Sequence, residues 1–444
     1  MTNIEERATD SMAAELNSLV RPDEGMVSRT VFSDEGIYRL ELDRVFTKTW
    51  LFIAHESQLS QPGDYVTNFM GEDPVIASRD AAGEVHVLLN SCRHRGMTVC
   101  GTDAGNAKFF RCPYHGFTYS NNGDLVGVSK GDTAYFGELD KSKLGLVRVP
   151  RVEQYKGMIF ANWDPDAMSL VDYLGADQLW YLDLPFEGAL GGLEAIGPTM
   201  KFRIKTNWKL PAENFSGDDY HVLYTHGSAF QLGFLPDYDL LGDYVAYFDH
   251  GHGMGDIAKP GRALQNDLGM VEHFGPEAIE YVKQYHARLA ERLSPLQADM
   301  YTVGEGNIFP QLSWIKFGAM HTFGLLQWHP KGPNEVEVWQ TTFFDAGAPQ
   351  VVKDFARAEM SQENSAAGIF GQDDGENFEQ ITKSTRGLKS REDDFNYTMG
   401  LGHEGEVKEP GYPGRLGTHY SEQNQRNFYR YWLQLMTTEG STHV

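Results

Sequence analysis

The stretches Cys92-Arg93-His94 and Cys112-Pro113-Tyr114-His115 carry the strongest structural signal in this sequence. Each offers one thiol and one imidazole on a short loop at the end of a predicted hairpin, and seventeen residues separate His94 from Cys112. Two such loops facing each other would present two sulfur atoms and two nitrogen atoms. Zinc accepts this set as a tetrahedron. A [2Fe–2S] cluster accepts it with two cysteines on one iron and two histidines on the other.

The spacing distinguishes between these two kinds of metal site. A zinc finger of this composition usually places both cysteines in one pair and both histidines in the other. Here each pair is mixed, as C-x-H and C-x2-H, and the flanking sequences read CRHRG and CPYHG. This is the Rieske pattern. The plainer alternative is an ordinary buried cysteine and a surface histidine in each loop. Cys100 lies outside the pattern, and we expect it to be a small buried apolar residue.

Around these stretches the sequence predicts a small all-β domain over about residues 40–160. Short runs that are β-branched or alternate in polarity are separated there by glycine and aspartate. The triplet Asn121-Asn122-Gly123 predicts a tight hairpin turn. The expected strands cover residues 64–69, 74–79, 84–90, 117–119, 124–126, 146–149 and 157–162.

The remainder of the chain has a mixed pattern that predicts an α+β fold, an antiparallel sheet with helices on one side. We expect three parts: a polar, helical N-terminal arm at residues 1–38 that packs on the last part, the all-β domain at 39–163, and the α+β domain at 164–444. The expected helices cover 209–225, 275–298, 350–370 and the tail from 424, and the expected strands cover 307–315, 321–329 and 335–344.

A second candidate metal site lies in NWKLPAENFSGDDYHVLYTH, residues 207–226. Asp218 and His221 are three residues apart, so they share a helix face. His221 and His226 are five apart, about 140° around an ideal helix, so both reach one metal only if the helix ends or distorts between them. Two histidines and a carboxylate form the set that binds non-haem Fe(II) and leaves positions open. Taken alone, the histidines could equally be ordinary core or surface residues.

The missing carboxylate has its best candidate in GQDDGEN, residues 371–377, which is expected just past a long helix. Its plainer interpretation is a solvated acidic turn, at about even odds on sequence chemistry alone. The Rieske pattern upstream favours the metal site, because a one-electron donor needs an acceptor.

Composition and charge limit the function classes. Lys and Arg number 38 against 62 Asp and Glu, a net charge of −24, which disfavours nucleic-acid and anionic-membrane binding. Three cysteines do not make a disulfide framework and fit a reducing compartment. We see no signal peptide and no apolar run long enough to span a membrane. We therefore expect a cytoplasmic protein.

The chain as a whole resembles the α (large, catalytic) subunit of bacterial Rieske non-haem iron aromatic ring-hydroxylating dioxygenases, of the naphthalene and biphenyl type. CRHRG, CPYHGFTYSNNG, the 207–226 segment and GQDDGEN carry this resemblance. The resemblance implies one [2Fe–2S] cluster and one mononuclear Fe(II) per chain. The implied cluster ligands are Cys92, His94, Cys112 and His115, and the implied iron ligands are His221, His226 and Asp374, the second Asp of its pair.

The resemblance also implies two further roles and an assembly. Asp218 matches a carboxylate that bridges the two metal centres, and Asn214 matches an active-site asparagine that lies near the iron without binding it. The implied architecture is a Rieske β domain plus a helix-grip-like catalytic domain. The implied assembly is α3β3 with a small β subunit, in which the cluster of one α subunit serves the iron of its neighbour. A reductase, often with a ferredoxin, would supply electrons from NAD(P)H.

An arene substrate needs an apolar pocket beside the iron. We place Phe215, Val222 and Phe370 near it, although plain core packing is nearly as good an account of each. Asn364 falls where relatives can carry a bulky aromatic residue. A smaller polar group there would enlarge or reshape the pocket, which suggests a larger or polar-substituted arene rather than naphthalene.

Four functions compete at this point. The first is a dioxygenase that uses O2 to cis-dihydroxylate an aromatic hydrocarbon or substituted arene in aromatic catabolism, which GQDDGEN favours. The second is a Rieske monooxygenase or demethylase on an aromatic substrate. The third, an electron-transfer protein with a degenerate second domain, would require His221, His226 or Asp374 to be absent or metal-free, and all three are present. The fourth is a zinc-structured binding module, which would be colourless.

Overall fold

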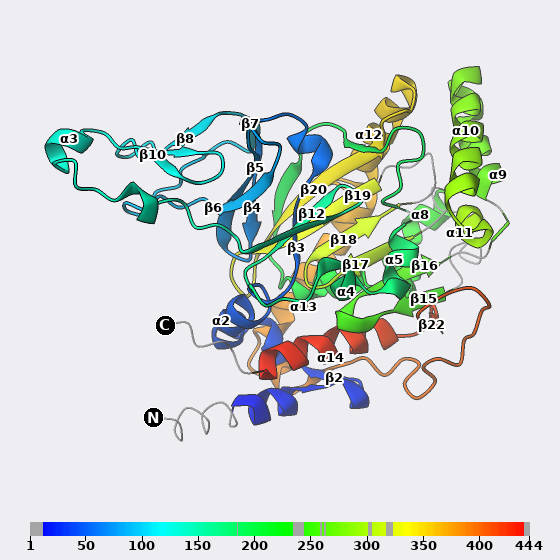
Figure 1. The fold of residues 1–444 in the computed structure, drawn as a ribbon. Helices are drawn as coiled ribbons and strands as arrows, with labels where there is room; N and C mark the ends of the chain where they lie inside the picture. Colours follow the sequence, from blue (N-terminus) through cyan, green and yellow to red (C-terminus); the bar gives the residue numbers. More distant parts are fainter. Residues whose placement is uncertain are drawn as a thin grey trace. The chain divides into compact units, whose positions relative to one another are not determined.

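The computed structural model describes residues 12–183, 185–233, 244–257, 260–261, 263–300, 304–316 and 323–438. The chain folds as two units, of which one contains Phe46–Leu170 and the other contains the described residues on either side of that segment. Figure 1 shows the strands of the first unit in blue to teal, and the second unit runs from green to red with the N-terminal residues in dark blue.

Three small antiparallel sheets build the unit Phe46–Leu170, with strand orders β6-β5-β4-β7, β10-β9-β8 and β11-β12-β3. One cluster of its buried apolar side chains includes Ile76, Leu88, Phe110 and Phe117. The prediction of an all-β domain here is confirmed. The strands are β3 Leu51–His55, β4 Asp64–Met70, β5 Asp73–Arg79, β6 Val85–Leu89, β7 Ala104–Asn106, β8 Phe109–Arg111, β9 Thr118–Ser120, β10 Leu125–Gly127, β11 Arg151–Tyr155 and β12 Met158–Asn162.

Some expected strands differ from the observed ones. The run 146–149 is not a strand but forms a single bridge between Leu88 and Arg148. Strands β3, β7, β8 and β11 were not predicted. Strands β7 and β8 are only three residues long and largely exposed, which is too short for an alternating pattern to be visible. The hairpin turn at Asn121-Asn122-Gly123 is present between β9 and β10, with Gly123 at φ 93°.

The second unit is organised on a nine-stranded antiparallel sheet of order β13-β20-β19-β18-β17-β16-β15-β22, with β14 paired to β20. Its central strands are buried along their whole length, as expected for a sheet covered on both faces. The strands are β13 Leu193–Ala195, β14 Met200–Ile204, β15 Tyr244–Tyr247, β16 Gly253–Ile257, β17 Glu305–Ile308, β18 Leu312–Ile315, β19 Phe323–Pro330, β20 Val336–Asp345 and β22 Arg415–Thr418.

The single strand expected at 307–315 is two strands, β17 and β18, joined by a turn at Phe309-Pro310-Gln311. Pro310 has no backbone N–H to donate to a ladder, so the run cannot continue as one strand. The expectations at 321–329 and 335–344 correspond to β19 and β20, although residues 321 and 322 lie outside the described residues.

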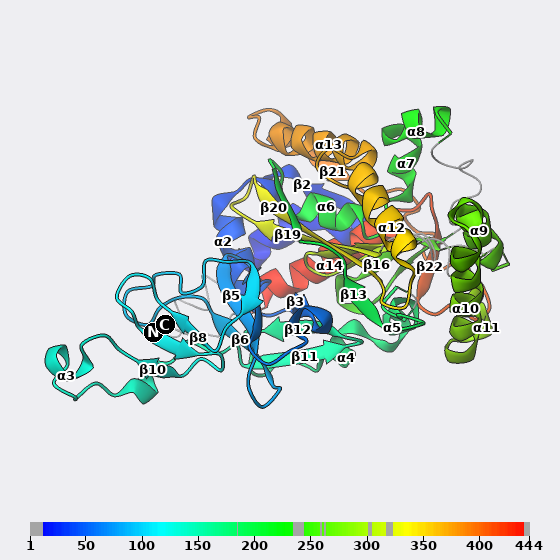
Figure 2. The same ribbon diagram turned by 90° about the horizontal axis from the view of Figure 1, so that it is seen from above.

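Three of the expected helices are divided. Residues 209–225 form α6 (Lys209–Asn214) and α7 (Asp219–Thr225), and 275–298 form α10 (Pro276–Arg292) and α11 (Pro295–Met300). Residues 350–370 hold α12 (Gln350–Glu363) and the start of α13 (Ile369–Thr385), and the tail helix is α14 (Gln423–Thr437). Helices α12 and α13 lie side by side (Figure 2). Helix α12 contacts β20, and α13 contacts β14.

The expectation of a helical N-terminal arm holds for only part of the described residues 12–38. Residues 12–19 are helical, but Val20–Arg21 (β1) and Met26–Ser28 (β2) are short strands, and α2 begins only at Glu35. Strand β2 pairs with β21, Asp394–Asn396, in the same unit. Both strands are too short to give an alternating pattern, and the second partner of β2 lies more than 360 residues away. Residues 1–11 lie outside the described residues.

Candidate metal centre and substrate pocket

The break between α6 and α7 sets the position of both candidate histidines. Gly217 has φ 109°, and a Cβ at this position would lie 2.7 Å from the carbonyl oxygen of Met254, so only glycine fits the turn. Helix α7 then carries His221 and ends at Thr225. His226 follows at φ −101° and ψ 23°, outside the helix. The prediction that the helix ends between the two histidines is confirmed.

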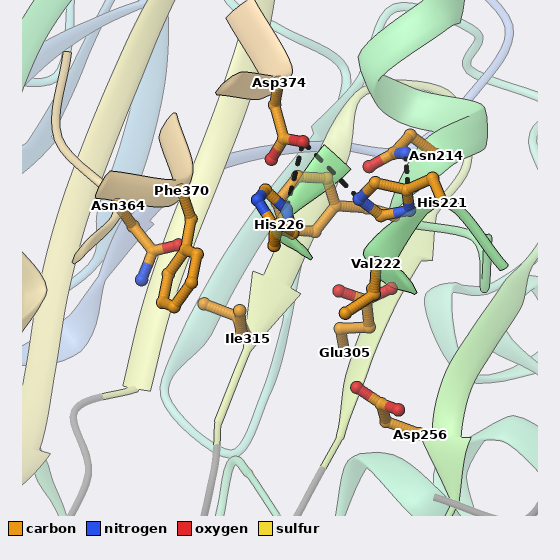
Figure 3. A pocket seen from close by; sticks show the side chains of 11 residues that line it. Asn214, His221, Val222, His226, Asp256, Glu305, Ile315, Asn364, Phe370 and Asp374 are labelled. Atoms are coloured by element: carbon orange, nitrogen blue, oxygen red, sulfur yellow. Dashed lines mark hydrogen bonds and ion pairs between the residues drawn. The ribbon is translucent and has the colours of Figure 1, made fainter. Parts of the chain in front are cut away.

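The third donor comes from α13. Asp374 Oδ1 lies 3.4 Å from His221 Nε2 and 3.3 Å from His226 Nε2, and one donor atom from each residue lies within 4.8 Å of the others (Figure 3). GQDDGEN is therefore part of a helix of its own, α13, and neither lies past the end of a helix nor forms the solvated acidic turn of the plainer interpretation. Asp373 faces the other nitrogen of His226, with its carboxylate 3.5 Å from Nδ1.

The charges of these groups are strongly coupled. Burial opposes the charged form of His221, but the hydrogen bond and charge of Asp374 and the charge of Asp218 outweigh it and raise the pKa of His221 to about 10. Burial likewise opposes ionisation of Asp374, but the two histidines outweigh it and lower its pKa to about 2. The site therefore favours an ionised carboxylate between two imidazoles.

This donor set fits a divalent iron. Asp374 Oδ1 is buried and has no hydrogen bond of good geometry to any described residue, although both Nε2 atoms lie at ion-pair distance from it. A buried carboxylate oxygen facing two imidazole nitrogens is the two-histidine, one-carboxylate arrangement of non-haem Fe(II) sites. The far nitrogen of His221 contacts the Asp218 backbone carbonyl and lies 3.3 Å from Asn214 Nδ2. These contacts leave Nε2 directed toward Asp374.

Asp218, the carboxylate that the resemblance places between the two metal centres, is not fully buried. Its side chain is 36% exposed in the single chain, and its Oδ2 lies 4.0 Å from His221 Nδ1. The contact that His221 makes with Asp218 is to the backbone oxygen instead. Asp218 directly precedes the first residue of α7, and its side chain makes no capping hydrogen bond to the helix.

A cavity of about 70 Å³ adjoins the three donors. The structure brings all four pocket candidates to its wall, and the ring of Phe370 lies 5.0 Å from that of His226. Sequence analysis missed Asp256, Glu305 and Ile315, which also line it. Asp256 and Glu305 come from β16 and β17, whose glycine and polar residues gave no recognisable strand signal at these positions. Ile315 ends β18, within the run expected as a strand, but nothing local marked it as a pocket residue. The lining residues are Asn214, Phe215, His221, Val222, His226, Asp256, Glu305, Ile315, Asn364, Phe370 and Asp374.

The two Cys–His loops of the other unit have matching backbones. In each, the cysteine N–H donates to a carbonyl five residues later, and a glycine four residues later donates back to the cysteine carbonyl. Gly96 and Gly116 adopt positive φ angles of 72° and 74°. The bonds are Cys92 to Met97 (2.9 Å), Gly96 to Cys92 (2.8 Å), Cys112 to Phe117 (2.8 Å) and Gly116 to Cys112 (3.0 Å).

The side chains of these loops fit a cluster of the Rieske kind. Cys92 and Cys112 are free thiols and buried. The rings of His94 and His115 lie 4.6 Å apart at 74°, and His94 Nδ1 is buried without a hydrogen-bond partner among the described residues. Two buried thiols and two neighbouring imidazoles satisfy the Cys2His2 requirement of such a cluster. Cys100 is buried beside them, as expected.

Comparison with known proteins identifies the family. Residues 175–438 match the family described as ring hydroxylating alpha subunit (catalytic domain), and residues 49–140 match the Rieske [2Fe-2S] domain. The chain belongs to the ring-hydroxylating alpha subunits. These are oxidoreductases that carry a Rieske [2Fe–2S] cluster and a mononuclear iron, and they work with a beta subunit, a ferredoxin and a reductase.

Individual ring-hydroxylating alpha subunits are similar over nearly their full length. Chlorobenzene dioxygenase subunit alpha of Cupriavidus sp. (strain PS12) is 40% identical, covering 96% of this chain and 94% of the relative. N,N-dimethyl phenylurea N-demethylase subunit alpha of Sphingobium sp. (strain YBL2) is 34% identical, with coverages of 95% and 94%. The crystal structure of naphthalene 1,2-dioxygenase from Rhodococcus sp. bound to indole superposes with a TM-score of 0.83 at 36% identity, covering 98% of this chain and 99% of that one.

Among the helices that the structure describes, none combines the length and the apolar character needed to cross a lipid bilayer.

Proposed function

We propose that this alpha subunit is the terminal oxygenase component that uses O2 and electrons from NAD(P)H to cis-dihydroxylate an aromatic hydrocarbon or substituted arene. The observation that carries the proposal is the convergence of His221, His226 and Asp374 within 4.8 Å at the wall of a cavity lined by Phe215 and Phe370. Three donors on one side of a metal leave positions open for dioxygen beside the substrate.

We assign His221, His226 and Asp374 to the mononuclear iron, and the four residues Cys92, His94, Cys112 and His115 to the cluster. Bound Fe(II) would supply redox chemistry and open coordination positions, and the cluster would supply single electrons. The chain itself orients and encloses the reactants. Asn214 and the Asp218 backbone fix the imidazole of His221, and the ring of Phe370 covers His226 on the substrate side.

We further propose an α3β3 assembly in which Asp218 links the iron of one alpha subunit to the cluster of its neighbour. The exposure of Asp218 in the single chain supports this role, because its carboxylate remains accessible to a residue from another subunit. A carboxylate that accepts hydrogen bonds from imidazoles of both centres would couple their protonation states.

The test is a reconstituted reaction of the purified oxygenase with ferredoxin, reductase, NADH and a panel of arenes. We expect cis-dihydrodiols, identified by mass and NMR, with both oxygen atoms derived from 18O2. A single oxygen atom in every product would contradict dihydroxylation. Absence of any oxygenated product from an oxygenase with full iron content would contradict the proposed function.

The second candidate is monooxygenation or N-demethylation of an aromatic substrate. It is favoured by the 34% identity to the N,N-dimethyl phenylurea N-demethylase subunit alpha, which spans 95% of this chain. Including N-methylated anilines and phenylureas in the panel, and measuring formaldehyde release, distinguishes the two reactions.

A further inference from the structure

The cavity has an acidic side that catalysis on a plain hydrocarbon does not need. Asp256 and Glu305 line it, together with the three candidate iron ligands. In Figure 3 both carboxyls lie below Val222, on the side opposite Asp374, and Phe370, Asn364 and Ile315 form another wall. Buried carboxyl oxygens are rare unless they are paired, so one without a partner on this wall requires an explanation.

Of the two carboxyls, that of Glu305 gives the stronger evidence for a bound ligand. It lies on β17, is only 8% exposed, and its Oε1 is buried without a hydrogen-bond partner among the described residues. Leaving a buried polar oxygen unsatisfied is costly, and such atoms are otherwise rare in folded proteins. A carboxyl oxygen in this state on a cavity wall is an acceptor suited to a ligand that donates a hydrogen bond.

Asp256 is held beside it by a strained backbone. It is 7% exposed and adopts φ 51°, which is unusual for a residue with a side chain. The carboxylate of Asp219 accepts the Asp256 backbone N–H at 3.1 Å and stabilises this conformation. Strain of this kind persists at functional sites where the surrounding structure imposes it.

Glu305 is in an environment that resists negative charge. Burial, followed by the charge of the neighbouring Asp256, raises the pKa of Glu305 well above its ordinary range. A cation placed among these groups would relieve their repulsion and favour their ionised forms. A metal ion is a poor candidate, because the carboxylate oxygens of Glu305, Asp256 and Asp219 do not converge within 4.8 Å of one another among the described residues.

We infer that the substrate is an arene with a protonated amine substituent, whose ammonium group binds Glu305 and Asp256 while its ring lies against Phe370 and Ile315. The inference rests on the proposed function, since it names the substrate class of that same pocket. An ammonium offers three N–H donors and a positive charge, which match the unsatisfied oxygen of Glu305 and the acidic wall. This assignment also agrees with Asn364, a polar residue in the opposite wall.

The test compares benzylamine, which is an ammonium ion at neutral pH, with its near-isostere ethylbenzene. Binding of each to the iron-loaded oxygenase is measured anaerobically by calorimetry, and both are then offered together to the reconstituted system. We expect benzylamine to bind at least about tenfold more tightly than ethylbenzene, as for a charge-assisted hydrogen bond in a buried site. Equal affinities in the unmodified protein would overturn the inference without any variant.

Two pocket variants test whether Glu305 and Asp256 cause the preference for benzylamine. Glu305→Gln keeps the shape and removes the charge, so the benzylamine preference should fall about tenfold. Asp256→Asn serves as a second variant if the first is poorly folded. The exposed Glu277→Gln on α10 is the matched control and should keep the full preference. A preference that survives both pocket variants would refute the inference.

The outcomes separate the two proposals. If ethylbenzene is dihydroxylated but benzylamine is not preferred, the substrate class is wrong and the proposed function stands. If benzylamine binds through Glu305 but neither arene is oxygenated by the fully iron-loaded system, the inference about binding holds and the proposed function fails.

Discussion

His226 follows the last residue of the helix that carries His221, and their imidazole rings cross at 74° with centroids 5.3 Å apart. A continuous helix would direct the two rings about 140° apart. Ending α7 at Thr225 therefore brings both Nε2 atoms to one side, where α13 supplies Asp374. The pair is the local feature on which the proposed iron site depends.

The two neighbouring aspartates of α13 provide a matched test of that site. Asp374→Asn should lower the affinity for mononuclear iron by at least about 100-fold, because it removes the anionic ligand. Asp373→Asn should keep the iron, since its carboxylate faces His226 Nδ1 instead. Iron and sulfide analysis of anaerobically purified protein measures both. Equal iron loss in the two variants would contradict the assignment of Asp374.

Tyr119 should raise the reduction potential of the cluster. Its hydroxyl accepts the Arg93 N–H at 3.1 Å, so its own hydrogen is available to Cys92 Sγ, 3.3 Å away. A hydrogen bond to a cluster sulfur stabilises the more negative reduced state. Loss of about 1 kcal/mol corresponds to about 40 mV for one electron, so Tyr119→Phe should lower the potential by that order. Protein-film voltammetry with Tyr114→Phe as control tests this, and an unchanged potential would exclude the bond.

The local parts of both candidate metal sites were predictable from the sequence. The Cys–His spacing and the offset between His221 and His226 are short-range patterns whose chemistry needs no knowledge of the fold. The family resemblance then selected Asp374 over Asp373. The strands β19 and β20 were also predicted, because both are long and apolar, and β20 is rich in β-branched and aromatic residues.

Long-range features were not predictable in this way. Glu305 and Asp256 reach the cavity only because β17 and β16 pair with each other within the large sheet. The segment Gly253–Ile257 contains two glycines and an aspartate, which by propensity indicate a loop rather than a buried strand. The break at Gly217 was hidden for a related reason, since its positive φ depends on close packing against Met254.

Asp218→Asn should leave both metal centres bound and reduce turnover about 100-fold, a size seen when partners of metal ligands are removed. The change keeps the backbone carbonyl that contacts His221 and removes only the carboxylate charge. Iron content and the cluster spectrum check that both sites are loaded. A stopped-flow measurement of cluster oxidation by the iron site locates the defect, which should lie in electron transfer between the centres. Product formation at the normal rate would defeat the bridging role.

Asn364→Phe should change the positions at which arenes are oxygenated. Asn364 directly follows the last residue of α12 and lines the cavity, so a phenyl ring there would reduce the space opposite Glu305. We expect a shift in regiochemistry with a substituted arene and a smaller effect with benzene. Asn364→Ala controls for loss of the amide alone. Identical product ratios in the wild-type protein and in Asn364→Phe would show that this wall does not orient the substrate.

Glu213 should make the stability of the catalytic unit depend on pH. It is buried, accepts a hydrogen bond from the Tyr397 hydroxyl at 2.9 Å, and burial, reinforced by the charges of Asp218 and Glu422, raises its pKa from 4.5 to about 8. A raised folded-state pKa means that the folded protein holds the proton more strongly. The stability that protonated Glu213 contributes is therefore fully present below pH 4.5 and is lost as pH rises through about 8.

Glu213→Gln cannot lose the proton, so it should become more stable than the wild type by a few kcal/mol at pH 8.5 and match it near pH 4.5. Denaturant unfolding across this range measures the difference, with the exposed Glu277→Gln as control. A difference that does not vary with pH would show that Glu213 is ionised in the folded protein throughout.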